Sequence, residues 1–136
     1  MIVGLGNDLV HLPRIDAVWR RHGERFCRKL LMPAEQSALP PKGDPVNRLA
    51  KAFAAKEALV KAMGTGFRGV SHLDCGVLRG AQGAPRLVFS ARLAERLRAD
   101  GVQRAHLALT DQGEWVLATV VLEGSGALGA AALEIA

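Results

Sequence analysis

The chain has 136 residues, of which 49% are hydrophobic and 23% are charged, and its formal net charge is +5. That length is enough for one domain with a buried core, and no segment approaches the roughly 18 consecutive apolar residues of a membrane-spanning helix. The N-terminus has no basic leader, and Cys27 and Cys75 have no paired spacing. We therefore expect a cytoplasmic domain with free thiols, which excludes the membrane-embedded and disulfide-stapled classes of protein.

The pattern of apolar residues, prolines and glycines predicts short strands and helices around one long helix. Pro45 is expected to open that helix and Gly64 to cap it, since glycine adopts left-handed backbone at low cost. Ser90 is a suitable N-cap for a later helix. In chain order we expect a strand over 2–10; helices from 13, over 24–31 and from 33 to the break at 40–43; the long helix over 45–63; strands over 75–78 and 86–89; a helix over 91–99; and strands over 105–110 and 115–123, turning at 111–113.

These elements indicate a single α+β domain over residues 1–123. The long central helix and the short helices are expected to pack on a small, mainly antiparallel sheet. Residues 124–136 are rich in glycine and alanine, which predicts a frayed or loosely docked tail. The first strand is expected to be buried through its apolar residues, Ile2, Val3, Leu5, Leu9 and Val10.

The long helix has an apolar stripe and a polar flank. Lys56 falls inside the stripe, which predicts that its stem packs in the core while its amine reaches water. Glu57 and Lys61 share the flank, where Ala50 and Ala54 are expected to leave room for a ligand. The stripe consists of Leu49, Phe53, Leu59, Val60 and Met63.

Positive charge is concentrated between residues 11 and 29, so that this segment should attract an acidic partner. A solvated helix face explains the same charge equally well. Nucleic acid is not expected as the partner, because only Trp19 and Phe26 offer stacking rings and no nucleic-acid-binding signature is present. The basic residues are Arg14, Arg20, Arg21, Arg25, Arg28 and Lys29, against Asp16 and Glu24.

Two carboxylates and one amine form a candidate site. Asp8 and Glu57 belong to different predicted elements, and Lys61 follows Glu57 by one helical turn. Mg²⁺ is held by few carboxylates, together with water and phosphate oxygens. The pattern therefore indicates a divalent-metal site that handles a phosphorylated ligand. Two alternatives remain open, namely an Asx-turn that closes the strand at Asp8 and a surface ion pair between Glu57 and Lys61.

Two further features are ambiguous. Exposed N–H groups in the loop Gly64-Thr65-Gly66 could complete a phosphate cradle. Glycine at that place is also an ordinary helix cap, and the negative end of the helix dipole repels phosphate. His106, on a predicted strand, could reach a phosphate or be purely structural.

Three segments resemble, in order and in spacing, the bacterial holo-acyl-carrier-protein synthases, the small group of 4'-phosphopantetheinyl transferases. The resemblance covers residues 1–123 and implies their fold. That family moves 4'-phosphopantetheine from coenzyme A to a serine of an apo acyl carrier protein, in fatty acid biosynthesis, and releases adenosine 3',5'-bisphosphate. The matching segments are 4–15 (GLGNDLVHLPRI), 53–66 (FAAKEALVKAMGTG) and 106–123, from HLALTD to the closing ATVVLE.

By motif position, the resemblance implies a role for each candidate residue. Asp8 and Glu57 would hold Mg²⁺ on the pyrophosphate, and a carboxylate or bound water near Asp8 would take the serine proton. Lys61 would stabilise or protonate the departing phosphate. The nucleotide would be contacted by Gly64, Thr65, Gly66 and His106, and the acidic carrier would dock on Arg14, Arg21 and Arg25.

Family members are typically trimers with shared active sites, which implies that Asp8 and His106 act across an interface from Glu57 and Lys61. Three positions depart from the family pattern. Ala52 replaces a usual arginine, His11 replaces a common acid, and Thr110-Asp111 replaces a hydroxyl–histidine pair. Ala52 keeps open an alternative function, a non-catalytic module that binds coenzyme A or the carrier. The sequence leaves open the preferred carrier, free or acylated coenzyme A as donor, and Mg²⁺ or Mn²⁺ as metal.

Overall fold

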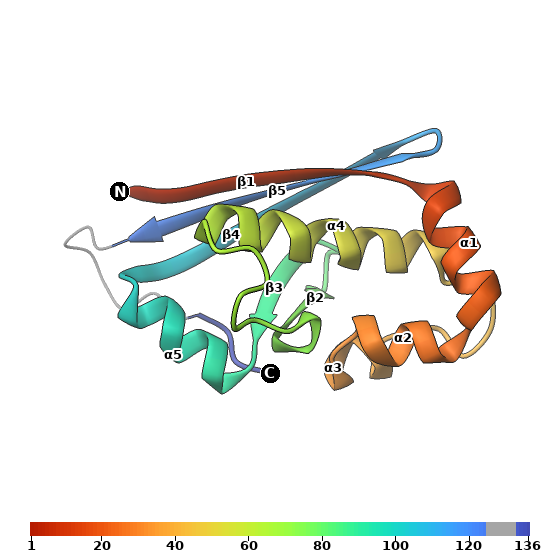
Figure 1. Ribbon diagram of the computed structural model, residues 1–136, viewed down its shortest axis with the longest axis horizontal. Helices are drawn as coiled ribbons and strands as arrows, with labels where there is room; N and C mark the ends of the chain where they lie inside the picture. The colour runs from red at the N-terminus through yellow and green to blue at the C-terminus, as the bar shows by residue number, and fades with distance from the viewer. Residues whose placement is uncertain (125–132) are drawn as a thin grey trace.

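The computed structural model describes residues 1–124 and 133–136, and it confirms the α+β fold (Figure 1). Two antiparallel sheets are present in these residues, one in the order β1-β5-β4 and one formed by β2 and β3. The elements are β1 (Ile2–His11), α1 (Leu12–His22), α2 (Glu24–Leu30), α3 (Pro33–Ser37), α4 (Val46–Met63), the 3-10 helix η1 (His72–Asp74), β2 (Cys75–Arg79), β3 (Pro85–Phe89), α5 (Ala91–Ala99), β4 (Val102–Gln112) and β5 (Trp115–Gly124).

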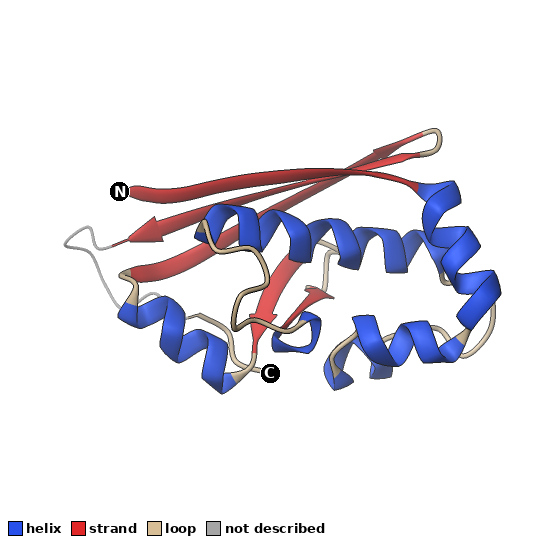
Figure 2. Ribbon diagram, in the orientation of Figure 1, coloured by secondary structure: helices blue, strands red, loops and turns tan. Residues whose placement is uncertain are grey.

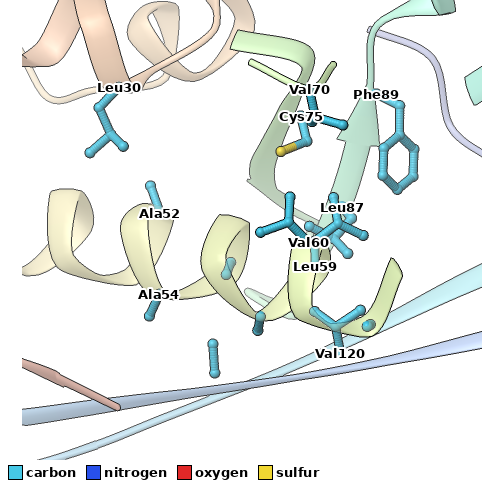
Figure 3. Packing of buried hydrophobic residues seen from close by; sticks show 14 of the residues in the cluster. Leu30, Ala52, Ala54, Leu59, Val60, Val70, Cys75, Leu87, Phe89 and Val120 are labelled. Atoms are coloured by element: carbon cyan, nitrogen blue, oxygen red, sulfur yellow. The ribbon is translucent and has the colours of Figure 1, made fainter. Parts of the chain in front are cut away.

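Helix α4 crosses the middle of the molecule, with the three-stranded sheet on one side and the β2–β3 hairpin on the other (Figures 1 and 2). Its predicted limits hold to within one residue, with Pro45 as N-cap and Gly64 as a left-handed C-cap at φ 75°. Both faces of the helix are buried, which explains why small residues are frequent along it. Ala54 points to the side of the three-stranded sheet, where Val120 also lies, whereas Ala52 points to the opposite side, toward Leu30 (Figure 3).

Strand β1 lies directly against α4 because two of its glycines have no side chain. A Cβ on Gly6 would collide with the Ala58 carbonyl and would lie 2.6 Å from Ala62 N, and a Cβ on Gly4 would collide with the Ala62 carbonyl. On the helix side, Ala50 and Ala54 are fully buried. The expectation that these two alanines leave room for a ligand is therefore wrong, because they let the sheet approach instead.

The prediction that β1 is buried through its large apolar residues is also wrong. Successive side chains of a strand point to opposite faces, and here the glycine face packs on α4. The opposite face leaves Leu5 65% and Leu9 58% exposed, and Ile2 and Val3 at the strand end are exposed as well. Among the five apolar residues expected in the core, only Val10 is buried.

The last four residues return to the second sheet. Leu133 is buried, and Ile135 forms a parallel bridge with Phe89. Phe89 N donates to Glu134 O at 2.8 Å, and Ala136 N donates to Phe89 O at 2.9 Å. A frayed or loosely docked tail was expected, and residues 133–136 are docked on β3 by these bonds, while residues 125–132 lie outside the described part of the chain. Cys27 and Cys75 are buried free thiols, as expected.

Candidate functional site

The site begins where β1 crosses α4. Asp8 is paired with Ala118 in the middle of β1, and the strand continues to His11, so the alternative of an Asx-turn at Asp8 is wrong. Lys61 Nζ lies 2.9 Å from Asp8 Oδ1 and donates to Asn7 O at 3.1 Å. Lys61 thus pairs with Asp8, not with Glu57 as in the helix-surface alternative. The glycine-lined contact of β1 with α4 brings the predicted residues together.

Asp8 and Glu57 face the same cleft of about 270 Å³, which also contains Arg14. Burial and then the negative charge of Asp8 raise the pKa of Glu57 above its ordinary value, and the Lys61 ammonium offsets this only in part. Two carboxylates therefore repel each other in a partly dry space that one exposed amine neutralises incompletely. The remaining walls are apolar and come from Leu9, Val10, Ile15, Val18, Phe26 and Phe53.

This donor set fits a hard divalent cation. Two carboxylates of like charge line an open cleft, and a cation between them would relieve the repulsion by Asp8 that adds to the effect of burial on the pKa of Glu57. Among the described residues, no third acid, histidine or cysteine gathers with them. Mg²⁺ suits such a sparse site because it keeps waters and takes phosphate oxygens as its other ligands.

The loop at the end of α4 was left open between a phosphate cradle and a helix cap. The backbone N–H of Gly64 donates to Lys61 O, and those of Thr65 and Gly66 donate to Val60 O. These N–H groups close the helix and are not free for a phosphate, so the alternative of a glycine cap is correct. The Thr65 hydroxyl donates to Gly66 O. Lys61, one turn earlier, is the group in this stretch whose charge can meet an anion.

His106 lies away from this cleft within one chain. It is opposite Val121 in the β4–β5 pair, on the sheet face that α4 does not cover, and its ring contacts the Glu123 carboxylate. Asp8 is on the covered face with Lys61. The expectation that Asp8 acts across an interface from Glu57 and Lys61 is therefore wrong, because within one chain Asp8 lines the same cleft as Glu57 and bonds to Lys61.

A basic groove adjoins the cleft. It is a second hollow of about 270 Å³ that shares Val18 and Phe26 with the first and carries Arg25, along with His22 and Lys29. Among the described residues, Arg14, Arg21 and Arg25 are exposed and have no ion-pair partner, whereas Arg20 bonds to Asp16 at 3.0 Å.

Sequence reasoning missed the apolar wall between the cleft and the groove. Phe26 was considered only as a stacking ring, and Phe53 only as part of the buried stripe of α4. Both are partly exposed and line the cleft. The signal that could have found Phe53 is its position one turn before Glu57 on the same helix face.

Each of the three departures from the family pattern lies away from the cleft. Ala52 is 3% exposed and borders a different cavity beside α3. His11, three residues from Asp8 along β1, bonds to Glu114 at 3.0 Å and packs on Trp115. Asp111 is paired with Lys51 at 3.4 Å and accepts from Asn47 at 3.2 Å, which ties the β4–β5 hairpin to α4.

Comparison with known proteins finds a matching family model and close relatives in sequence. Residues 4–120 match the model of the 4'-phosphopantetheinyl transferase superfamily. A holo-[acyl-carrier-protein] synthase of Neisseria gonorrhoeae is 44% identical over 124 residues, which cover 90% of this chain and 99% of that protein.

Solved structures of proteins with similar sequences have a similar fold. The crystal structure of holo-[acyl-carrier-protein] synthase from Neisseria meningitidis has a TM-score of 0.86 and 43% identity, over 90% of this chain and 99% of that one. A synthase from Bacillus anthracis in complex with CoA (3',5'-ADP) has a TM-score of 0.71 and 34% identity, over 92% and 99% of the two chains.

Proposed function

We propose a function from one premise: the chain belongs to the 4'-phosphopantetheinyl transferase superfamily. It transfers 4'-phosphopantetheine from coenzyme A to a serine of an apo acyl carrier protein. The observation that supports this most directly is a cleft that holds Asp8 and Glu57, with Lys61 bonded to Asp8 and a basic groove next to it. The structure of a relative in complex with coenzyme A supports the donor.

The reaction needs a nucleophile, a charged diphosphate and a leaving group in one line. The serine oxygen forms a bond to the β-phosphorus as the bond to the α-phosphate oxygen breaks, and adenosine 3',5'-bisphosphate leaves with the electron pair. Lys61 is placed to offset or protonate the charge that develops on this phosphate. The serine proton passes to a carboxylate or water beside Asp8.

Asp8 and Glu57 would hold Mg²⁺, which when bound supplies charge neutralisation at the diphosphate. The fit rests on their oxygen donors, their mutual repulsion and their opening to the cleft. Lys61 bonds to Asp8, and its exposed side chain has room to turn toward a phosphate. The loop Gly64-Thr65-Gly66 would contribute close backbone approach to the nucleotide, not N–H donors.

The carrier would dock on the unpaired cations Arg14, Arg21 and Arg25. Arg14 borders the cleft and Arg25 borders the groove beside it. An acidic protein placed on this surface would present its serine at the mouth of the cleft. Charge complementarity of this kind acts mainly on the association rate and on the choice of partner.

We also propose that the chain assembles as a homotrimer. The outer face of the three-stranded sheet exposes Ile2, Leu5 and Leu9, and a second copy is a physical reason for such an apolar face. His106 lies on the same face, so a neighbouring copy could bring it to a cleft other than its own. Sedimentation should give three times the monomer mass, and Leu9→Asp should lower it. A monomeric wild type would refute the assembly.

The location that suits this reaction is the cytoplasm, where coenzyme A and its carrier proteins are available. Within the described residues, the helices are too short or too polar to span a membrane.

The test of the function is a transfer assay. Apo carrier proteins of the fatty-acid and polyketide types are incubated with the protein, coenzyme A and Mg²⁺, and the mass of each carrier is measured. A gain of one phosphopantetheine is the expected result, and it should disappear with a chelator. An unchanged mass for every carrier, with folded protein, would refute the function. The alternative of a non-catalytic module gains no support from Ala52, which is buried away from the cleft.

A further inference from the structure

Lys56 is the most deeply buried charged residue among those described, and it is adjacent in sequence to Glu57. Its side chain is 0% exposed. Its Nζ lies 2.6 Å from Glu35 Oε1 and donates to His72 O at 2.8 Å and to Leu30 O. The expectation that its amine reaches water is wrong, because three acceptors from three other elements enclose it.

Glu35 is the acidic partner of Lys56, and it has further hydrogen bonds of its own. Its carboxylate also accepts the N–H of Met32 at 3.1 Å and that of Val77 at 3.0 Å. Among the described residues, no buried side-chain nitrogen or oxygen lacks a hydrogen-bond partner. The pair thus connects α4 to α2, α3, η1 and β2. A buried pair with this number of partners needs accurate spacing of the elements around it.

The packing around the pair leaves little tolerance. A Cβ on Gly76 of β2 would lie 2.6 Å from Met32 Sδ and 2.8 Å from Glu35 Cδ. On η1, the ring of His72 stacks on Phe67 at 4.0 Å and lies 6.3 Å from the Phe53 ring. Lys56 thus holds the backbone carbonyl of His72, and the His72 ring lies next to Phe53, which lines the cleft.

The pair is linked to the cleft through two helices, α2 and α4. Leu30 is the last residue of α2, and its carbonyl is one of the end groups that a helix cannot satisfy by itself. The same short helix carries Phe26, which lines both the cleft and the basic groove. Lys56 holds the end of α2, and the next residue of α4 is Glu57. This contact therefore ties α2, which carries Phe26, to the turn of α4 that carries Glu57.

We propose that Lys56 and Glu35 are positioning residues that set the basic groove relative to Glu57, and so determine how well the acyl carrier protein is presented to the cleft. The inference rests on the proposed function for its substrate. It predicts that loss of the pair weakens use of the carrier and not use of coenzyme A.

The kinetic test compares Lys56→Met with Leu97→Ala. Leu97 is fully buried on α5, at the other end of the molecule from α2 (Figure 1), so its truncation lowers stability without touching the groove. Per folded molecule, Lys56→Met should raise KM for the carrier at least 10-fold and leave KM for coenzyme A within 2-fold. Leu97→Ala should leave both unchanged. Equal carrier KM in the two variants would overturn the proposal.

A double variant separates positioning from stability. Lys56→Met alone leaves the Glu35 carboxylate buried without its cation, and adding Glu35→Gln removes that charge. The double variant should regain part of the lost stability and keep the raised KM for the carrier, because the tie to α2 is still absent. Recovery of KM together with stability would show that the pair acts only on stability.

Hydrogen exchange tests the inference independently of transfer. In Lys56→Met, amides of residues 24–30 should lose protection at least 100-fold more than amides of α5. A uniform loss across the molecule would overturn the positioning role. If the wild type modified no carrier, the proposed function would fail while this measurement would still decide whether Lys56 anchors α2.

Discussion

Helix α4 contributes to two clusters of acidic and basic side chains, and these clusters differ in how completely their charges are paired. At Lys56 and Glu35, two opposite charges are buried, and every polar atom has a partner. At the cleft there are two acids and one half-exposed amine, and that amine, of Lys61, bonds to Asp8 and leaves Glu57 without an ion pair among the described residues. The first arrangement has no capacity left for a ligand. The second keeps unbalanced negative charge next to water, which is what a cation-dependent phosphate site requires.

The largest expected effect is the loss of transfer in Glu57→Gln. Removing one of the two carboxylates should lower the rate of carrier modification by at least about 10³-fold, because metal-assisted stabilisation of charge contributes several kcal/mol. Stability should stay the same or rise by up to about 1 kcal/mol, since the repulsion with Asp8 disappears. Transfer kinetics and urea denaturation measure the two effects.

The matched control for that variant is Glu95→Gln on α5, an exposed carboxylate outside the cleft. It should retain full transfer and full stability. Normal turnover in Glu57→Gln would remove Glu57 from the site, and a large loss of stability would mean that its carboxylate is structural.

The second prediction concerns Lys56, on the other face of the helix, where the large effect is expected on stability. Lys56→Met should lower the free energy of unfolding by about 3–5 kcal/mol, because a buried carboxylate is left without its cation. Lys51→Met on the same helix should change stability far less, since its partner Asp111 lies at the surface, where water can solvate the carboxylate. The midpoints of urea unfolding compare the two. Equal losses would contradict the distinction between the buried pair and the surface pair.

Sequence patterns predicted the elements well but not which groups they satisfy. Pro45, Gly64 and Ser90 act locally, so the limits of α4 and α5 could be foreseen. Glu35 lies 21 residues before Lys56 on a separate helix, and helical periodicity contains no information about such a partner. The amine of Lys56 was therefore expected to reach water.

The same limit applies to the site. Asp8 and Glu57 could be matched by their chemistry, and the structure brings them to one cleft. The faces of β1 could not be assigned, because its apolar residues and its glycines alternate and both suit a buried strand. In the structure, the face of β1 that carries the glycines packs on α4. Likewise, the hydrogen-bond partners of the Gly64 loop depend on the actual geometry of the helix end.

The third prediction concerns the close contact of β1 with α4 at Gly6. Gly6→Ala should lower stability by about 2–3 kcal/mol, because the added Cβ collides with the Ala58 carbonyl and pushes β1 away from α4. Transfer should fall as well, since Asp8 moves with the strand. Gly80→Ala is the control, because its Cβ would meet only Ala84 O at 3.9 Å. A Gly6→Ala protein with unchanged stability and transfer would disprove the close approach.

The smallest expected effect compares two carboxylates whose pKa values shift in opposite directions. Burial raises the pKa of Glu57, with Asp8 adding to the shift. Burial acts in the same direction on Asp74, but hydrogen bonds from Ser71 N and Ser90 Oγ and the Arg92 guanidinium outweigh it, so that the pKa of Asp74 is lowered. Asp74 therefore stabilises the fold when ionised, whereas Glu57 does not.

The sign of the pH dependence follows from that lowered pKa. In the unfolded chain Asp74 takes up its proton at a higher pH than in the folded protein, so its contribution is complete above the unfolded pKa. It is lost as the pH falls through the folded pKa. Asp74→Asn should lower stability by about 1 kcal/mol at pH 7. The difference from wild type should shrink toward pH 3, as measured by urea unfolding across pH. Asp16→Asn, which removes a surface ion pair with Arg20, should keep the wild-type acid dependence. If Asp74→Asn kept that dependence too, another carboxylate would have to stabilise the fold against acid.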